Sequence, residues 1–214
     1  MSERPPTHYF SPSPGAPSRR RAVRLDLPDL SVELVTDRGV FSAERVDPGT
    51  KVLLLEGPPP PAAGDVLDLG CGYGPIALAL AARAPGATVW AVDVNERART
   101  LTRENAAAAG LDNVRVAAPE EMPPDVRFAA IWSNPPVRIG KGALHDLLIG
   151  WLRRLAPGAH ALLVVQKHLG SDSLHRWLQQ QGFAVTRRTS RMAYRVLDVT
   201  GGVAADAPGE EAAP

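Results

Sequence analysis

Hydrophobic and polar residues alternate in two short stretches near the amino end of the chain. Residues 22–27 and 31–36 carry apolar side chains at nearly every second position, and Pro28 and Asp29 lie between them. Alternation with this period is typical of half-buried strands, and proline and aspartate favour turns. The pattern therefore predicts a small β-hairpin.

A short helix is expected to follow this hairpin. Asp47 is a favourable N-cap residue, and Pro48 suits the first position of a helix. Residues 52–55 supply an apolar face, and Gly57 with the prolines after it ends the helix. We expect residues 22–57 to form an extension ahead of the main domain.

Apolar, strand-like runs alternate with helical stretches in the main domain, residues 64–200. The predicted strands are residues 65–69, 88–92, 113–116, 128–133, 159–166, 183–188 and 194–199, and the predicted helices are residues 74–83, 96–109, 142–155 and 172–181, the last capped by Ser171. Strands that alternate with helices favour a mostly parallel sheet with right-handed crossovers. No helix separates the last two strands, so we expect an antiparallel hairpin at the sheet edge. The fold class is therefore a Rossmann-like, doubly wound, seven-stranded α/β domain.

Composition narrows the class of protein. The chain has 214 residues, 44% of them hydrophobic and 22% charged, which fits one globular domain. We expect residues 1–21 to be a flexible arm and residues 201–214 a disordered tail, because neither can bury a core. The longest apolar run, residues 76–82, is far below the roughly 20 residues that cross a bilayer. A single cysteine, Cys71, excludes an internal disulfide and a zinc site of several thiolates, so we expect a cytoplasmic location and no metal.

A glycine-rich turn follows the first strand of the main domain. Gly70, Gly72 and Gly74 stand between this strand and a helix, where backbone amides can approach a ligand closely. A dinucleotide-binding fingerprint would place its third glycine at Pro75, so hydride transfer loses its main support. Asp68 would repel a pyrophosphate but suits the ammonium group of an amino-acid moiety.

An acidic residue, Asp93, ends the next predicted strand. At this place a carboxylate can accept both hydroxyls of a ribose, and Val94 and Asn95 are candidates for contact with an adenine. Asp93 could instead cap the following helix. Because it accompanies Asp68 and the glycines, ligand binding is the better interpretation.

The loop DLGCGYG and Asp93 together resemble the class I S-adenosylmethionine-dependent methyltransferases. The resemblance covers residues 64–200 and implies S-adenosyl-L-methionine as the cofactor, with its methionine end at the glycine loop and its ribose at Asp93. The cofactor-binding residues that it implies are Asp68, Gly70, Cys71, Gly72, Gly74, Asp93, Val94 and Asn134.

The fourth strand runs into Asn134, Pro135 and Pro136, beyond the carboxyl end of the sheet, where open α/β folds bind ligands. Two prolines stiffen the turn and bring no amide hydrogen. We therefore expect the Asn134 side-chain oxygen and the Pro135 carbonyl to be acceptors without a competing local donor. They could take the hydrogens of a planar exocyclic amine and direct its lone pair at a methyl sulfonium.

Asn-Pro-Pro at this place resembles the amino-directed methyltransferases, which act on adenine N6, guanine N2 or a glutamine amide. The fuller run NPPVRIGK, with RGVFSAERVDPGTKVLLLE and HYFSPSP upstream, is similar to the methyltransferase small-domain family. The best-known members of that family methylate guanine N2 of small-subunit ribosomal RNA. The resemblance implies ribosomal RNA or a pre-ribosomal particle as the partner.

Two positions depart from the pattern of the relatives. Ala118 stands where many have an aspartate for the adenine amino group, and Val137 where many have an aromatic residue that stacks on the target. Phe41 is our candidate for stacking, although it could equally anchor the extension in the core. Arg138 and Lys141, beside the catalytic turn, are further candidates for substrate contacts.

Charge is divided unevenly although the formal net charge is only +1. Residues 56–133 carry six basic and ten acidic residues, whereas residues 134–200 carry ten basic and three acidic ones. A basic target half suits contacts to the phosphates of RNA. Four of its arginines surround the predicted last hairpin: Arg187, Arg188, Arg191 and Arg195.

We therefore expect an S-adenosylmethionine-dependent methyltransferase that acts on guanine N2 of ribosomal RNA. One alternative is methylation of a protein glutamine, which shares the Asn-Pro-Pro chemistry. A second alternative is a cofactor-binding RNA chaperone without turnover, which only Ala118 and Val137 support. The oligomeric state is open.

Overall fold

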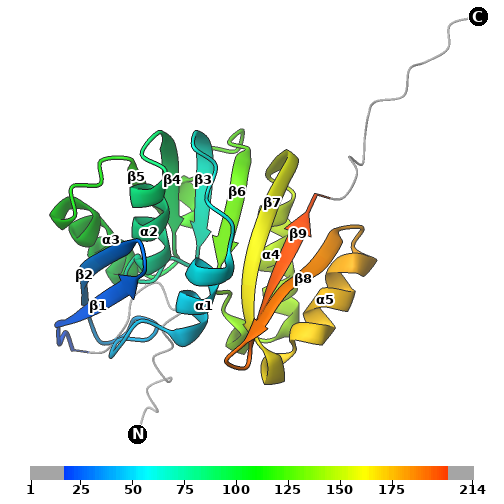
Figure 1. Ribbon diagram of the computed structural model, residues 1–214, viewed down its shortest axis with the longest axis horizontal. Coiled ribbons are helices and arrows are strands. Elements are labelled where there is room, and N and C mark those ends of the chain that lie inside the picture. Colours follow the sequence, from blue (N-terminus) through cyan, green and yellow to red (C-terminus); the bar gives the residue numbers. More distant parts are fainter. Residues whose placement is uncertain (1–16, 202–214) are drawn as a thin grey trace, which may run out of the picture.

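The computed structural model describes residues 17–201, which form a seven-stranded sheet between two layers of helices, with a separate two-stranded sheet beside it (Figure 1). The strands are β1 (Arg21–Leu27), β2 (Leu30–Thr36), β3 (Gly64–Leu69), β4 (Ala87–Val92), β5 (Val114–Ala117), β6 (Phe128–Ser133), β7 (Leu155–Gln166), β8 (Ala184–Arg191) and β9 (Tyr194–Thr200). The helices are α1 (Pro48–Glu56), α2 (Pro75–Arg83), α3 (Glu96–Ala108), α4 (Lys141–Leu152) and α5 (Ser171–Gln180), with 3-10 turns η1 (Pro119–Glu121), η2 (Val137–Ile139) and η3 (Lys167–Leu169). No helix within residues 17–201 has the length and apolar character needed to span a membrane.

The large sheet has the strand order β5-β4-β3-β6-β7-β9-β8. Its first five strands are parallel, and β9 pairs antiparallel with both β7 and β8. The predicted doubly wound sheet with an antiparallel hairpin at its edge is therefore confirmed. The connections from β3 lead to one side and those from β6 to the other, so a crevice opens where these two strands end.

Two hydrophobic cores lie on the two faces of this sheet. Alternate residues of one strand point into different cores: Val66 packs with the alanine-rich helix α2, whereas Leu67 packs on the side of α4 and α5. Leu25 and Leu34 of the β1–β2 hairpin belong to the first of these cores. The amino-terminal extension is therefore packed into the main domain, and α1 is held between the hairpin and the large sheet (Figure 1).

Three local expectations were wrong: the end of α4, the start of β7 and the cap of α5. Helix α4 ends at Leu152, because the chain turns there and β7 already begins at Leu155, which pairs with Phe128. Helix α5 is preceded by Gly170 in the left-handed conformation, and Ser171 is its first helical residue. The Ser171 hydroxyl accepts a hydrogen bond from the buried Arg195, which needs polar partners, and does not cap the helix.

Part of the predicted amino-terminal arm is held against the domain. Residues 1–16 lie outside the described residues, as does the predicted tail beyond residue 201. Ser18 and the Arg19 amide, however, donate hydrogen bonds to the carboxylate of Asp37, and Arg20 pairs with Glu104. The described end of the arm is thus bound to the loop after β2 and to α3.

The buried side chain of Asn105 joins three parts of the fold. Its carbonyl oxygen accepts from the Val35 amide at 2.7 Å, and its amide group donates to the Val35 carbonyl at 2.9 Å and the Tyr73 carbonyl at 2.8 Å. The side chain therefore forms with the free edge of β2 the pair of hydrogen bonds that a neighbouring strand would form. It also connects β2 to the glycine loop through the Tyr73 carbonyl.

Replacing Asn105 by alanine would leave these three backbone groups without partners in the interior. We expect the free energy of unfolding to fall by about 3 kcal/mol, since an unsatisfied buried polar group costs about 1–3 kcal/mol. Urea unfolding followed by circular dichroism measures this change. Asn113→Ala is a matched comparison, because it removes three amide-to-carbonyl hydrogen bonds that do not involve β2. An equal loss of hydrogen-exchange protection at the backbone amides of the β1–β2 hairpin in both variants would contradict the role of Asn105.

Candidate active site

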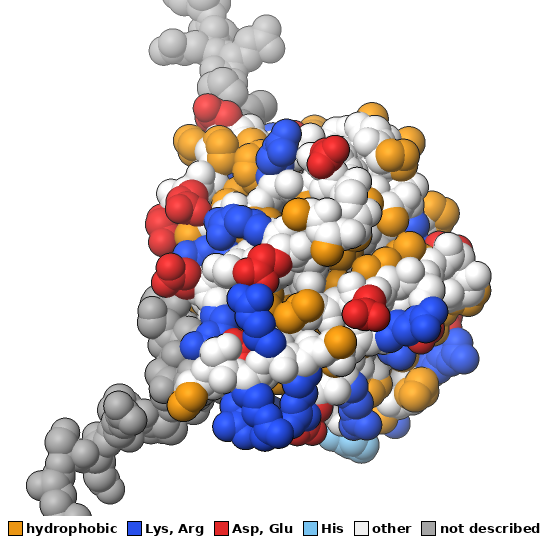
Figure 2. Space-filling view, turned by 90° about the vertical axis from the view of Figure 1, so that its left-hand side faces the viewer, with side chains coloured by type: hydrophobic (Ala, Val, Ile, Leu, Met, Phe, Trp, Pro, Cys, Tyr) orange, Lys and Arg blue, Asp and Glu red, His pale blue; other side chains and the backbone are white. Residues whose placement is uncertain are grey.

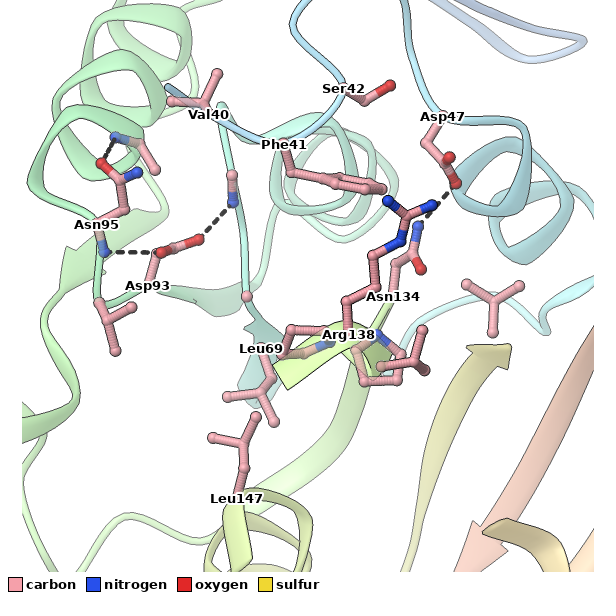
Figure 3. Close-up of a pocket in the computed structure, with 18 of the residues that line it drawn as sticks. Val40, Phe41, Ser42, Asp47, Leu69, Asp93, Asn95, Asn134, Arg138 and Leu147 are labelled. Atoms are coloured by element: carbon pink, nitrogen blue, oxygen red, sulfur yellow. Dashed lines mark hydrogen bonds between the residues drawn. The ribbon is translucent and has the colours of Figure 1, made fainter. Parts of the chain in front are cut away.

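A pocket of about 410 Å³ opens at the carboxyl ends of β3, β4 and β6. Leu69 and Ser133 pair in register, and the Ser133 hydroxyl donates to the Leu69 carbonyl at 2.7 Å, so the two strands end together. The glycine loop after β3 and the Asn-Pro-Pro turn after β6 therefore become neighbours. The segment between β2 and α1 closes the third side of the pocket (Figure 3).

The glycine loop turns its backbone toward this pocket. Gly70 and Gly72 have φ angles of 77° and 58°, and a Cβ atom at either would meet no atom within 4 Å. Both residues line the pocket, so the missing side chains leave room for a ligand against the backbone. Gly74 has another role, because a Cβ there would lie 2.9 Å from the Leu78 side chain inside the domain.

Asp93 closes the loop on its far side. Its carboxylate accepts hydrogen bonds from the Gly72 amide at 2.9 Å and from the Asn95 amide at 2.8 Å (Figure 3). Helix α3 is capped by Asn95, whose side chain accepts from the Ala98 amide, so Asp93 is not the helix cap. Burial raises the pKa of Asp93. A half-buried carboxylate on the pocket wall fits a ligand that brings hydroxyl donors, as a ribose does.

Asp68 lies beneath the glycine loop and outside the pocket wall. It is fully buried, and its Oδ2 atom accepts from the Ala77 amide at 2.9 Å in the first turn of α2. Its Oδ1 atom has no hydrogen-bond partner among the described residues. Burial, followed by the nearby charge of Asp93, raises the pKa of Asp68 to about 8. An orphaned carboxylate oxygen under the loop fits a cofactor with a cationic end, although contact with an ammonium group stays a prediction.

The orientation of Asn134 is set by the extension. Its Nδ2 group donates to Asp47 Oδ1 at 2.8 Å and to Thr50 Oγ1 at 3.1 Å. The same Asp47 oxygen caps α1 by accepting from the amides of Gly49 and Thr50. The predicted N-cap is thus confirmed, and it has a second role that the sequence did not reveal: the donors of Asn134 are engaged, so its carbonyl oxygen is left for a substrate.

The Asn-Pro-Pro turn differs in one respect from our expectation. The Pro135 carbonyl was expected to have no local donor, but the Val137 amide donates to it at 2.8 Å. Pro136, with φ −75° and ψ 69°, is the centre of this inverse γ-turn. A carbonyl oxygen has two lone pairs, so Pro135 retains one acceptor position.

The predicted substrate residues divide into two groups. Phe41, Val137 and Arg138 line the pocket, and Phe41 has 38% of its surface exposed, which excludes the alternative of a core anchor. Figure 3 shows Phe41 and Arg138 extending into the mouth of the pocket near Asn134. Lys141 is exposed at the start of α4 and does not line the pocket.

Some pocket residues were not foreseen. Leu147, Gln166, Leu169 and Tyr194 line the pocket from α4, the end of β7, η3 and the start of β9. No motif marks them, and only the arrangement of the strands brings them together. Among the predicted cofactor residues, Cys71 lines a small adjoining cavity of about 20 Å³.

A family comparison now decides the relationship. The family model for the methyltransferase small domain matches residues 31–198. The chain belongs to this family. It is therefore a member of the S-adenosylmethionine-dependent methyltransferases, as the glycine loop, Asp93 and the Asn-Pro-Pro turn indicated.

Individual relatives agree with this membership. The uncharacterized protein YbxB of Bacillus subtilis (strain 168) is 34% identical over 193 residues, which cover 89% of this chain and 96% of YbxB. Ribosomal RNA small subunit methyltransferase C of Shewanella amazonensis is 33% identical over 150 residues, which cover 68% of this chain and 43% of that protein. The T. thermophilus 16S rRNA N2 methyltransferase (RsmC), solved with AdoMet and guanosine, superposes with a TM-score of 0.73 at 27% identity and covers 86% of this chain and 51% of that one. The chain spans about half the length of these ribosomal RNA methyltransferases.

In this methyltransferase small domain, Asp47→Ser separates helix capping from the positioning of Asn134. Serine caps a helix about as well as aspartate but is too short to reach the Asn134 amide as well. We expect the rate constant of methyl transfer to fall roughly 10- to 100-fold, because misplacement of a catalytic group by about 1 Å can cost that much. Calorimetry should give an unchanged Kd for S-adenosylmethionine. An unchanged transfer rate in Asp47→Ser would contradict the positioning role.

Asp68→Asn tests the buried carboxyl group through the pH dependence of stability. The folded-state pKa of about 8 exceeds the value of 3.8 for an exposed aspartate, so the native state binds the extra proton and stability falls as pH rises from about 4 to 8. Asparagine keeps the shape without this titration. We expect the free energy of unfolding of ligand-free Asp68→Asn, measured relative to that of the wild type by urea unfolding, to rise by roughly 2–4 kcal/mol between pH 5 and pH 8.5. Parallel stability curves for the two proteins would show that Asp68 does not titrate in this range.

Proposed function

We propose that this methyltransferase transfers a methyl group to the exocyclic N2 amine of guanine in small-subunit ribosomal RNA. The observation that carries the proposal is the orientation of Asn134. Because Asp47 and Thr50 accept from its amide group, the Asn134 oxygen is directed to the pocket as an acceptor at the end of β6. An acceptor held in this way suits a substrate that offers N–H groups, as a planar amine does.

The chain would act by positioning and electrostatics. S-adenosylmethionine supplies a methyl group on a positively charged sulfur. The Asn134 oxygen and the free lone pair of the Pro135 carbonyl accept the two amine hydrogens, which turns the nitrogen lone pair toward the methyl carbon. Attack of this nitrogen on the methyl carbon would form the nitrogen–carbon bond as the carbon–sulfur bond breaks, and the amine proton would leave to solvent afterwards. No strong base is needed at the turn.

Cations around the pocket favour a nucleic acid over a protein glutamine. Six lysine and arginine side chains on segments that flank the pocket form no ion pair within residues 17–201: Arg38, Arg45, Lys51, Arg138, Lys141 and Lys167. Figure 2 shows lysine and arginine side chains gathered along the lower edge of the molecule, which is the edge where β3 and β6 end in Figure 1. Unpaired cations suit phosphates, which position RNA without reading its sequence.

The four arginines of the last hairpin contribute less than we expected. Arg187 and Arg195 pair with Asp172, Arg188 with Asp198, and Arg191 with Glu56. These four arginines already have acidic partners, so the charges available to RNA lie nearer the pocket. A cytoplasmic location accords with ribosomal RNA as the substrate.

Asn134→Ala tests this assignment. We expect binding of S-adenosylmethionine to persist, while methyl transfer to unmodified ribosomal RNA falls roughly 100- to 1,000-fold, as for the loss of one catalytic hydrogen-bonding group. A labelled-methyl assay and calorimetry measure the two quantities. Full activity of Asn134→Ala would contradict the mechanism.

The substrate is tested by mass spectrometry of nucleosides from ribosomal RNA with and without the gene. We expect one N2-methylguanine to be lost. Unchanged ribosomal RNA together with a lost methylglutamine in a protein would decide for the glutamine alternative.

A further inference from the structure

A second hollow, of about 390 Å³, lies on the outer side of the segment that walls the active-site pocket. We name it the outer groove. Its lining includes Arg45, Lys51, Val52, Leu55 and Met192, which come from the segment before α1, from α1 and from the β8–β9 turn. None of its lining residues is among those that line the active-site pocket.

One segment of chain forms a wall of both hollows. Phe41, Ser42 and Asp47 line the active-site pocket, whereas Glu44 and Arg45, between them in sequence, line the outer groove. A polymer whose target base enters the pocket would therefore bring its neighbouring residue over this segment and into the groove.

The large apolar side chains that are exposed to solvent lie in the active-site pocket and the outer groove. Five large hydrophobic residues are exposed among residues 17–201. Phe41, Val94 and Leu169 line the active-site pocket, while Leu55, 43% exposed, and Met192, 68% exposed, line the outer groove. The groove thus shares with the pocket a property that marks binding sites.

The backbone presents Met192 in an unusual way. Met192 and Ala193 both have left-handed conformations, with φ angles of 50° and 64°, where turns of this kind usually have asparagine or glycine. A large apolar side chain at such a position is a local outlier, and outliers of this type concentrate at functional sites.

The charges of the groove favour an anionic occupant. Arg24 pairs with Asp26, Arg191 pairs with Glu56, and the acidic Glu44 lies 3.7 Å from Arg21. Arg45 and Lys51 remain without an ion pair among the described residues. The groove therefore has an apolar floor and two cations without a direct ion pair on its wall, with the charge of Asp26 near enough to Lys51 for Lys51 to lower the pKa of Asp26. This combination matches a nucleotide with its base and phosphate.

We propose that the outer groove binds the RNA nucleotide next to the methylated one, with Leu55 and Met192 against its base and Arg45 and Lys51 at its phosphates. The proposal rests on RNA being the substrate. It assigns to the extension and the β8–β9 turn a part in holding the substrate that is separate from the chemistry at Asn134.

The double variant Arg45→Gln, Lys51→Gln tests the groove. The probe is a short fluorescein-labelled single-stranded RNA with one guanine, titrated by anisotropy at several salt concentrations. We expect roughly tenfold weaker binding at low salt and a salt slope that is smaller by about 1.4, since each phosphate contact on a single strand contributes about 0.7. The Kd for S-adenosylmethionine should not change.

The double variant Arg127→Gln, Arg153→Gln is the matched control, because it removes the same amount of positive charge. Both residues are exposed and lie before β6 and β7, at the opposite ends of the strands from the pocket. We expect its RNA binding to stay within twofold of the wild type. Met192→Gly removes the apolar tip and suits the left-handed backbone, so it should weaken RNA binding without lowering Tm.

RNA binding and salt slope that match the wild type in both groove variants would overturn the groove assignment while leaving the proposed function intact. Wild-type protein that methylates a glutamine and binds no RNA would overturn both. Competition for the groove by a polyglutamate peptide as strong as by RNA would overturn the nucleotide in favour of an acidic protein.

Discussion

One carboxylate oxygen connects the amino-terminal extension to the chemistry. Asp47 Oδ1 caps α1 and holds the amide group of Asn134, so the direction of the Asn134 oxygen depends on where α1 lies. The position of α1 depends in turn on its buried leucines, which share a core with the β1–β2 hairpin. The extension is therefore a structural requirement of the site, although it lies outside the strands that hold the cofactor motif.

A second constraint is the burial of carboxyl groups under the glycine loop. Removal from water raises the pKa of both Asp68 and Asp93, and the nearby charge of Asp93 raises the pKa of Asp68 further. A cofactor with a cationic end would relieve this repulsion, which gives the ligand-free protein a reason to bind it. The two carboxyl groups are thus in an unfavourable electrostatic environment where the ligand is expected, a common feature of functional sites.

Much of this arrangement could be predicted from the sequence. The alternation of apolar runs and helical stretches predicted the large sheet, and the glycine spacing and Asn-Pro-Pro predicted which strand ends form the site. Contacts between distant segments could not be predicted in this way. Nothing local to Asp47 indicates that Asn134 lies within hydrogen-bond distance, 87 residues along the chain.

The partners of the charged side chains could not be predicted from the sequence either. The sequence indicated a basic carboxyl half, but it could not show that Arg187 and Arg195 share Asp172 while Arg45 and Lys51 form no ion pair within residues 17–201. Likewise, the Val137 amide reaches the Pro135 carbonyl only through the turn geometry at Pro136. Partner choice among side chains is decided by the tertiary fold.

The most direct test of the central claim is a crystal structure of this protein with S-adenosylhomocysteine and guanosine. We predict that the guanine N2 atom lies within hydrogen-bond distance, about 2.7–3.2 Å, of the Asn134 oxygen, with the Asn134 amide still bound to Asp47. A guanine bound elsewhere, or an Asn134 amide turned away from Asp47 toward the ligand, would contradict it.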